Sequence, residues 1–259
     1  LHTNERPSRG RFHDGRGVDY RTKMVEMHIS EIGFCAGHSA SGVWINEKGE
    51  TTVPGLYGAG DMASIPHSYM LGAFVYGQIC GENATEFARD REFAELDIDY
   101  ILAEKERILA PLKREDGIPA NQFEYKARRL VNDYLQPPKV TKKMDIGLQR
   151  LQAMDEDIPF LYARDPHELL RVHEAQHILD CAQMAAVASM FRTESRWGLY
   201  HNYVDFPEIN NADWFCHVQL YKDENGKMAC RKKEIEPYVV ELDESEKSAY
   251  QKMRVQKAG

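Results

Sequence analysis

The chain has 259 residues, of which 42% are hydrophobic and 29% are charged, as expected for a globular protein. Its formal net charge of −8 argues against nucleic-acid binding, because phosphate groups are bound by a basic face. No run approaches the roughly 20 apolar residues that cross a bilayer, and residues 1–20 lack the apolar stretch of a secretory signal. We therefore expect a cytoplasmic protein with no membrane span and no nucleic-acid partner.

The cysteines are scattered along the chain: Cys35, Cys80, Cys181, Cys216 and Cys230. Because no two of them form a CxxC pair, we do not expect this chain to carry an iron–sulfur cluster or a thiolate zinc site of its own. An odd and scattered set of cysteines is typical of reduced thiols in a cytoplasmic protein.

Short strands are predicted in the first third of the chain. Apolar and polar residues alternate over residues 25–29 with the period of a half-buried strand. Residues 42–46 and 51–57 predict two further strands, joined by a turn at residues 47–50. The pattern then becomes helical and predicts a helix over residues 71–89, whose small-residue face can lie close to a sheet or a ligand.

Helices dominate the middle of the chain, and a hairpin follows them. Apolar residues at helical spacing predict four helices, over residues 97–112, 121–135, 146–155 and 166–190. Asp165 and Pro166 form a good N-cap and first-turn pair for the last of them. The sequence Asp223-Glu224-Asn225-Gly226 is typical of a hairpin turn. The predicted fold is α+β: a β-rich segment with a flanking helix, then a helical bundle domain, then a terminal β-hairpin.

One motif in the fourth predicted helix is typical of zinc enzymes. His173-Glu174-Ala175-Gln176-His177 has the HExxH spacing, which places two imidazoles on one helix face with Glu174 as a base for metal-bound water. A third ligand is not evident, since Glu194 does not follow in a recognised ligand helix. The alternative is a helix face whose histidines make ordinary hydrogen bonds. We assign no metal ligands and keep a zinc-dependent hydrolase as an alternative hypothesis.

Three glycine-containing segments in order form a more specific pattern. Gly37-His38-Ser39-Ala40-Ser41-Gly42 closes a strand, Gly58-Ala59-Gly60-Asp61 is a turn with an acid at its tip, and Leu71-Gly72-Ala73-Phe74 opens a helix. Glycines let the backbone approach a flat ring or a sugar, and the acid can accept hydrogen bonds from ligand hydroxyls. The helix N-terminus directs N–H groups and a positive dipole end at an electron-rich ligand.

These segments resemble the flavin-contacting segments of the fumarate reductase/succinate dehydrogenase flavoprotein superfamily. Residues 55–61 are similar to its second flavin-contacting segment, and residues 37–42 to the strand that brings a histidine to the flavin edge. The similarity is greatest to the adenylylsulfate reductase alpha-subunit branch. It covers most of residues 24–240 and includes residues 191–197 and 213–215, which resemble the terminal part of those subunits.

The resemblance implies an FAD-dependent oxidoreductase that exchanges electrons with a small substrate, in this branch a sulfur anhydride, through the flavin N5 atom. It implies His38 as the catalytic residue, acting by a hydrogen bond or a positive charge at the flavin edge or the substrate. The residues implied in cofactor binding are Gly37, His38, Ser39, Gly60, Asp61, Gly72, Ala73 and Phe74. The family carries no zinc in its helical domain, which weakens the hydrolase hypothesis.

Two departures from the family pattern are informative. Met70 stands where fumarate reductases and succinate dehydrogenases carry an arginine that binds a dicarboxylate, which disfavours fumarate or succinate as the substrate. The amino-terminal Gly-x-Gly-x-x-Gly that holds the FAD pyrophosphate has no counterpart here. We therefore expect the carboxy-terminal half of a flavoprotein subunit, with Leu1 as an interior boundary and the amino-terminal FAD-binding portion missing.

The expected domains are the carboxy-terminal part of an FAD-binding domain (1–92), a helical domain (93–196) and an aromatic-rich tail with the hairpin (197–259). Because the cysteines provide no cluster site, the expected partner is an iron–sulfur, ferredoxin-like electron-transfer subunit. Glu194 and Arg196 are interpreted as a structural ion pair. A further alternative is a non-catalytic, degenerate homologue that serves as an interaction module.

Overall fold

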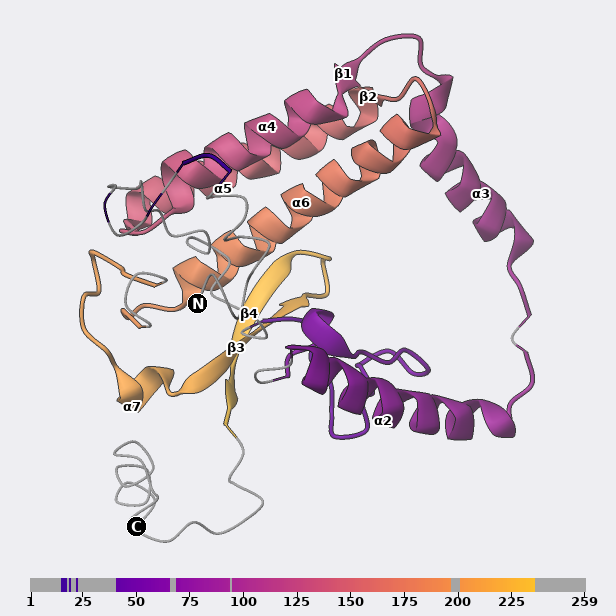
Figure 1. Cartoon of the computed structure of the whole chain (residues 1–259), viewed down its shortest axis with the longest axis horizontal. Helices are drawn as coiled ribbons and strands as arrows, with labels where there is room; N and C mark the ends of the chain where they lie inside the picture. The colour runs from indigo at the N-terminus through magenta and orange to yellow at the C-terminus, as the bar shows by residue number, and fades with distance from the viewer. Residues whose placement is uncertain are drawn as a thin grey trace, which may run out of the picture. The chain divides into compact units, whose positions relative to one another are not determined.

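The residues that the computed structural model describes are 15–17, 19, 22, 41–65, 69–93, 95–196 and 201–235. The chain divides into two compact units, Leu1–Glu31 and Ile32–Gly259. In the first unit, the Thr22 N–H donates to the carbonyl oxygen of Asp19 over 3.1 Å and closes a turn. The helices and strands drawn in Figure 1 belong to the second unit. The strand predicted over residues 25–29 lies outside the described residues.

Residues 41–65 form irregular backbone held by single β-bridges, Val43 to Ala63 and Glu50 to Tyr57. The predicted turn is confirmed, since the Asn46 side-chain oxygen accepts from the backbone N–H groups of Lys48 and Glu50, both over 3.0 Å. The strands predicted over residues 42–46 and 51–57 are wrong in extent. Asn46 diverts backbone donors to its own side chain, and Gly55 has a φ of 83°, so neither segment stays extended.

The helix α2 (Tyr69–Arg89) follows the short 3₁₀ turn η1 (Gly60–Met62) and packs against it. It begins two residues before the predicted start. On its inner face Cys80 is buried, and its Sγ lies 3.3 Å from the carbonyl oxygen of Gly58. A Cβ on Gly49 would overlap this sulfur, so Gly49 must lack a side chain for the loop to pack here. Gly49 therefore allows the close approach between loop and helix, whereas a Cβ on Gly77 or Gly81 of the predicted small-residue face would meet nothing within 4 Å.

The helix α3 (Ile98–Leu109) continues into the 3₁₀ turn η2 (Ala110–Lys113). Its first turn is capped by Asp97, whose carboxylate accepts from the backbone N–H of Tyr100 over 2.9 Å. The prediction of one helix over residues 97–112 is confirmed in position. The helix buries none of its own residues.

Three long helices form the bundle, and Figure 1 shows α4, α5 and α6 side by side. They are α4 (Ala120–Leu130) with the π turn η3 (Val131–Leu135), α5 (Thr141–Ala153) with η4 (Met154–Phe160), and α6 (Pro166–Phe191). Strands β1 (Ile118–Pro119) and β2 (Leu161–Tyr162) pair in parallel at one end. The fully buried core residues include Phe123, Leu135, Met144, Leu151, Met154, Leu161, Val172 and Leu179.

The sequence of α6 explains its central place in the bundle. Its buried residues recur at intervals of three and four, which places them on one stripe: Leu169, Val172, Ala175, Leu179, Ala182, Gln183 and Ala186. The alanines keep this stripe shallow enough for both α4 and α5 to pack against it. The Asp165 carboxylate accepts from the Glu168 N–H over 2.8 Å and Pro166 opens the first turn, so the predicted start is confirmed.

The terminal hairpin is also confirmed. After the short helix α7 (Asn211–Trp214), strands β3 (Cys216–Lys222) and β4 (Met228–Glu234) pair antiparallel, with Leu220 opposite Cys230. The turn between them is closed by the Asp223 carboxylate, which accepts from the N–H groups of Asn225 and Lys227. Both strands pack against α6. A two-stranded hairpin is marginal alone, so this contact stabilises it.

Candidate functional site

The junction of η1 with α2 brings two of the predicted segments together. Gly60 is buried and has a φ of 74°, a conformation that favours glycine. A Cβ built on Gly60 would lie 3.6 Å from the Cβ of Ala73, so turn and helix meet almost without an intervening side chain. Asp61 follows at once and is exposed at the tip of the turn. The turn therefore presents a carboxylate beside the start of a helix, as the sequence pattern predicts.

The remaining predicted segment, residues 37–42, ends beside the same turn. The structure describes this segment from Ser41 onward. A Cβ on Gly42 would lie only 2.5 Å from the carbonyl oxygen of Met62, and the Val43 N–H donates to that oxygen over 2.7 Å. The backbone of residues 42–43 thus runs directly alongside η1. The predicted site residues Gly37, His38 and Ser39 lie outside the described residues.

The position at which α2 starts limits which backbone N–H groups the helix N-terminus can direct at a ligand. In an α-helix that begins at Tyr69, the N–H groups of residues 69–71 have no carbonyl partner within the helix. The N–H of the fourth residue donates to the carbonyl just before the helix, as Ile101 donates to Asp97 in α3. Among the three predicted residues, only Gly72 lies in this first turn, and its N–H closes the turn rather than pointing out of it. Ala73 packs on Gly60 instead, and the Phe74 ring is 71% exposed on the surface of the helix.

Cys80 is the anchor that sequence reasoning missed. Its thiol lies under the loop that carries Gly58 and Asp61, and burial raises the pKa of the thiol. A neutral, buried thiol is a packing group and a weak hydrogen-bond donor rather than a nucleophile. The sequence pattern does not say which residue of the helix meets the loop, so it carries no signal for Cys80.

The HExxH motif forms ordinary hydrogen bonds. His173 Nε2 lies 3.0 Å from the Ile108 carbonyl oxygen and its Nδ1 lies 3.2 Å from Gln176 Oε1, so both ring nitrogens are engaged. Glu174 pairs with Arg171. Over the described part of the chain, no three His, Cys, Asp or Glu side chains are placed to hold a metal ion. The zinc hydrolase alternative therefore has no ligand set in the described residues.

A buried polar network holds the segment after α6. Glu194 is 0% exposed, and its carboxylate accepts from Arg192 Nη1 and Arg196 Nε, each over 2.6 Å. The Asn210 N–H donates to the other carboxylate oxygen over 2.9 Å. Burial alone would raise the pKa of Glu194, but the hydrogen bonds from Arg196 and Asn210 outweigh it and lower the pKa. The predicted structural ion pair is confirmed and extended by a second arginine.

Lys139 and His201 extend this network and have no signal in the sequence. Lys139 Nζ lies 2.9 Å from Ser189 Oγ and 3.3 Å from His201 Nδ1. His201 Nε2 lies 3.1 Å from the Arg192 carbonyl oxygen, which can only accept, so Nε2 carries the proton and Nδ1 accepts from the lysine. Burial lowers the pKa of Lys139 to about 8, and burial together with the Lys139 charge lowers the pKa of His201 to about 4.

The His201 pKa predicts an acid-dependent loss of stability. Between about pH 6.5 and 4 the unfolded chain binds a proton on this imidazole that the folded chain does not, so stability falls as the pH falls through this window. We expect His201→Gln, which keeps one donor and one acceptor, to remove about 3 kcal/mol of this pH dependence. Urea unfolding at several pH values measures the pH dependence of the free energy of unfolding for each protein. The exposed control His177→Gln should follow the wild type, and parallel curves for all three proteins would contradict the assignment.

The chain matches a known protein family over about half of its length. Residues 125–256, about half of the chain, match the family described as the fumarate reductase flavoprotein C-terminal region. The chain belongs to this family and is the C-terminal region of a flavoprotein of the fumarate reductase/succinate dehydrogenase superfamily. The resemblance inferred from the glycine segments is confirmed at this level. None of the helices among the described residues is both long enough and apolar enough to span a membrane.

Individual relatives extend the similarity beyond the family match. The chain is 24% identical over 205 residues to an uncharacterised FAD-dependent oxidoreductase of Methanocaldococcus jannaschii, covering 76% of this chain and 36% of that protein. It is 27% identical over 194 residues to adenylylsulfate reductase subunit alpha of Megalodesulfovibrio gigas, covering 67% of this chain and 29% of that subunit. The adenylylsulfate reductase structure of Archaeoglobus fulgidus superposes with a TM-score of 0.70 at 26% identity, over 77% of this chain and 36% of that one. The chain thus spans about a third of the length of the relatives it matches.

Proposed function

We propose that the chain is part of an FAD-dependent oxidoreductase and contacts the isoalloxazine and ribityl side of the flavin. The observation that carries the proposal is the contact of Gly60 with Ala73, which leaves the backbone of the turn bare beside the Asp61 carboxylate. A carboxylate at this point can accept hydrogen bonds from the ribityl hydroxyls, and the bare backbone admits a flat ring. The FAD-dependent relative from M. jannaschii supports the assignment.

The junction fits the cofactor in its chemistry. Gly60 and Asp61 would hold the ribityl chain, and the positive end of the helix dipole, in the first turn that Gly72 closes, would stabilise negative charge on the flavin pyrimidine. Ala73 and Phe74, which follow Gly72 in the helix, would lie toward the flavin pyrimidine, with Gly37 and Ser39 beside the ring. When bound, FAD supplies the redox chemistry, exchanging electrons with the substrate through its N5 atom. We assign His38 as the residue that donates a hydrogen bond, or presents a positive charge, to the flavin edge or the substrate.

We infer that the first turn of α2 disfavours a dicarboxylate as the substrate. Met70 lies in this turn, and its side chain is exposed. A thioether cannot form the bidentate pair with a carboxylate that an arginine forms, so a dicarboxylate would have no such partner here. The similarity to adenylylsulfate reductase subunit alpha supports a sulfur anhydride.

Two further components complete this function. An amino-terminal FAD-binding portion, on the same polypeptide or a separate one, binds the ADP side of the cofactor. An iron–sulfur, ferredoxin-like subunit passes the electrons, because the scattered cysteines of this chain offer no cluster site. The relative from M. gigas is itself a subunit of an enzyme, in agreement with a multi-chain assembly.

The flavin spectrum of purified protein tests the proposal. The 259-residue chain is produced alone and together with its amino-terminal portion, and the visible absorption of bound flavin is compared with the protein concentration. We expect stoichiometric FAD only when both portions are present. Stoichiometric FAD on the chain alone would contradict the shared site. Flavin in neither sample would overturn the proposed function and favour the non-catalytic interaction module.

A further inference from the structure

A side chain of the terminal hairpin contacts the segment that runs alongside η1. Lys233 of β4 places its Nζ 4.2 Å from the centre of the Trp44 ring, and both side chains are half-buried. An ammonium group at this distance over an indole ring is attracted by the electron-rich face of the ring, a cation–π contact. Trp44 comes directly after Val43, which pairs with η1. The hairpin, close to the end of the described chain, is thus in contact with the neighbour of the Gly60–Asp61 turn.

The backbone next to Trp44 is hydrogen-bonded to the turn in both directions. The Val43 N–H donates to the Met62 carbonyl oxygen over 2.7 Å, and the Ser64 N–H donates to the Val43 carbonyl oxygen over 2.9 Å. Asp61 lies directly before the first of these partners. These two bonds form an isolated bridge, which lacks the neighbouring pairs that support a regular strand. A side-chain contact beside the bridge therefore has a large share in fixing where the turn lies.

The position of Lys233 is itself fixed by the hairpin and by the end of α6. Strand β4 pairs with β3 over the full length of both strands. Arg192, the C-cap residue of α6, donates from Nη2 to the Cys216 carbonyl oxygen over 2.7 Å and so holds the first residue of β3. Beside Lys233, the Nζ of Lys232 lies 3.8 Å from the centre of the Trp214 ring. The ammonium group over Trp44 is therefore carried by an anchored element rather than by a loop.

We propose that Lys233 is a positioning residue for the flavin site. Through Trp44 it holds the segment that pairs with η1, and so it fixes the Asp61 carboxylate where the ribityl hydroxyls of FAD meet it. This inference rests on the proposed function. A binding group is effective only when supporting residues hold it close to the productive geometry, and a short turn with one isolated bridge needs such support. The C-terminal hairpin thereby takes part in cofactor binding.

Titration of the apoprotein with FAD tests this role in the protein that joins the 259-residue chain to its amino-terminal portion. Lys233→Gln is expected to weaken FAD binding about three- to tenfold, because it removes the cation from the Trp44 ring. Trp44→Leu should weaken it at least as much, and adding Lys233→Gln to that variant should have little further effect, since both substitutions remove one interaction. Lys233→Arg keeps a cation over the ring and should bind FAD as the wild type does.

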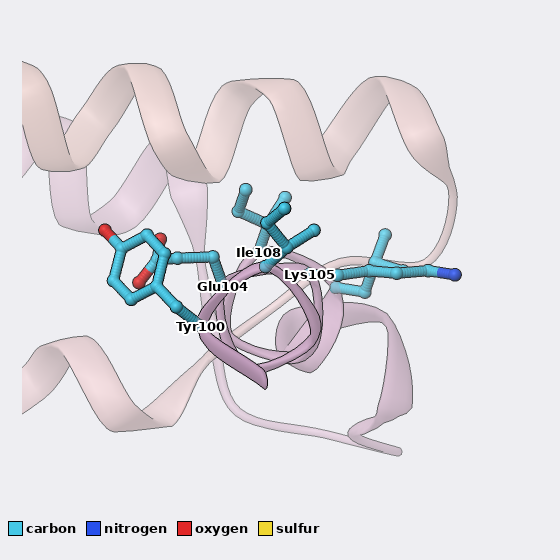
Figure 2. Close-up of a pocket in the computed structure, with 6 residues that line it drawn as sticks. Tyr100, Glu104, Lys105 and Ile108 are labelled. Carbon is cyan, nitrogen blue, oxygen red and sulfur yellow. The ribbon is translucent and has the colours of Figure 1, made fainter. Parts of the chain in front are cut away.

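Lys105→Gln is the matched control for the loss of one positive charge. Lys105 lines a shallow depression on α3 together with Tyr100, Glu104 and Ile108, among others. Figure 2 shows its side chain on the opposite side of Ile108 from Tyr100 and Glu104. Its loss should leave the affinity for FAD unchanged. An equal loss for Lys105→Gln, or additive losses for Lys233→Gln and Trp44→Leu, would assign the effect to charge acting at a distance and overturn the positioning role.

Hydrogen exchange in the apoprotein tests the same contact without flavin. The amide groups of Val43 and Ser64, which donate across the bridge, should exchange at least about threefold faster in Lys233→Gln than in the wild type. Full affinity for FAD in Lys233→Gln would overturn only the positioning role. A wild-type protein that binds no FAD would overturn the proposed function, and the exchange rates alone would then decide whether Lys233 holds the turn.

Discussion

Replacing Glu194 with alanine is expected to lower the free energy of unfolding by about 3–5 kcal/mol, because it removes one partner of a buried ion pair. The carboxylate is 0% exposed and is shared by Arg192 and Arg196, so its loss leaves a buried and a partly buried guanidinium group facing a cavity where their counter-charge stood. The Asn210 N–H also loses its acceptor. Urea unfolding of wild type and variant at neutral pH measures the difference.

An exposed ion pair provides the matched control for this substitution. Glu174 pairs with Arg171 on the surface of α6, where both side chains remain more than 40% exposed. Exposed pairs contribute about 0–1 kcal/mol, so Glu174→Ala should have little effect. A loss below about 1 kcal/mol for Glu194→Ala would show that the buried network is not what holds the segment after α6.

In the flavin-binding protein, Asp61→Ala is expected to lower the affinity for FAD by roughly 10–100-fold. A hydrogen bond to a charged group contributes about 1.5–3 kcal/mol, and the substitution removes the acceptor that we assign to the ribityl hydroxyls. The backbone at Gly60 and Ala73 stays as it is, because Asp61 is exposed at the tip of the turn. The ratio of bound flavin to protein, followed by titration of the apoprotein with FAD, measures the loss.

His173→Ala is the control that separates the flavoprotein from the hydrolase. The hydrogen bonds of His173 are made with the Ile108 carbonyl oxygen and with Gln176 and not with the Gly60–Asp61 turn, so its loss should leave flavin occupancy unchanged. If Asp61→Ala kept full flavin while His173→Ala abolished activity together with a bound zinc ion, the hydrolase hypothesis would replace the one favoured here.

The bundle and the hairpin could be predicted from the sequence because their signals are local. Asp165 and Pro166 mark the start of α6. The spacing of Leu169, Val172 and Leu179 predicts its buried face from this segment alone. The segment 41–65 could not be predicted in the same way. Its alternating residues are typical of strands, but Asn46 and Gly55 bend the backbone, and only single bridges form.

In the candidate site, too, the local features could be predicted from the sequence and the long-range contacts could not. The Gly60–Asp61 turn and the helix after it are local patterns, and their adjacency followed from chain order. The anchor Cys80 and the Lys139–His201 contact join residues far apart in sequence, and a single buried side chain leaves no periodic trace. The exact start of α2 could not be predicted either. Because the helix begins two residues earlier than predicted, Ala73 lies past its first turn and packs on Gly60.

One contact of the tail has a consequence for the order of assembly during synthesis. Thr141 opens α5, and its N–H and Oγ1 donate to the Asp205 carboxylate over 2.7 and 2.6 Å. The Val204 N–H donates to the Lys139 carbonyl oxygen, and the Lys139 N–H donates to that of Asn202. The first turn of α5 therefore leaves the ribosome well before the residues that cap it. Closing this long loop is a non-local step, so the bundle reaches its final form only after the tail has been translated.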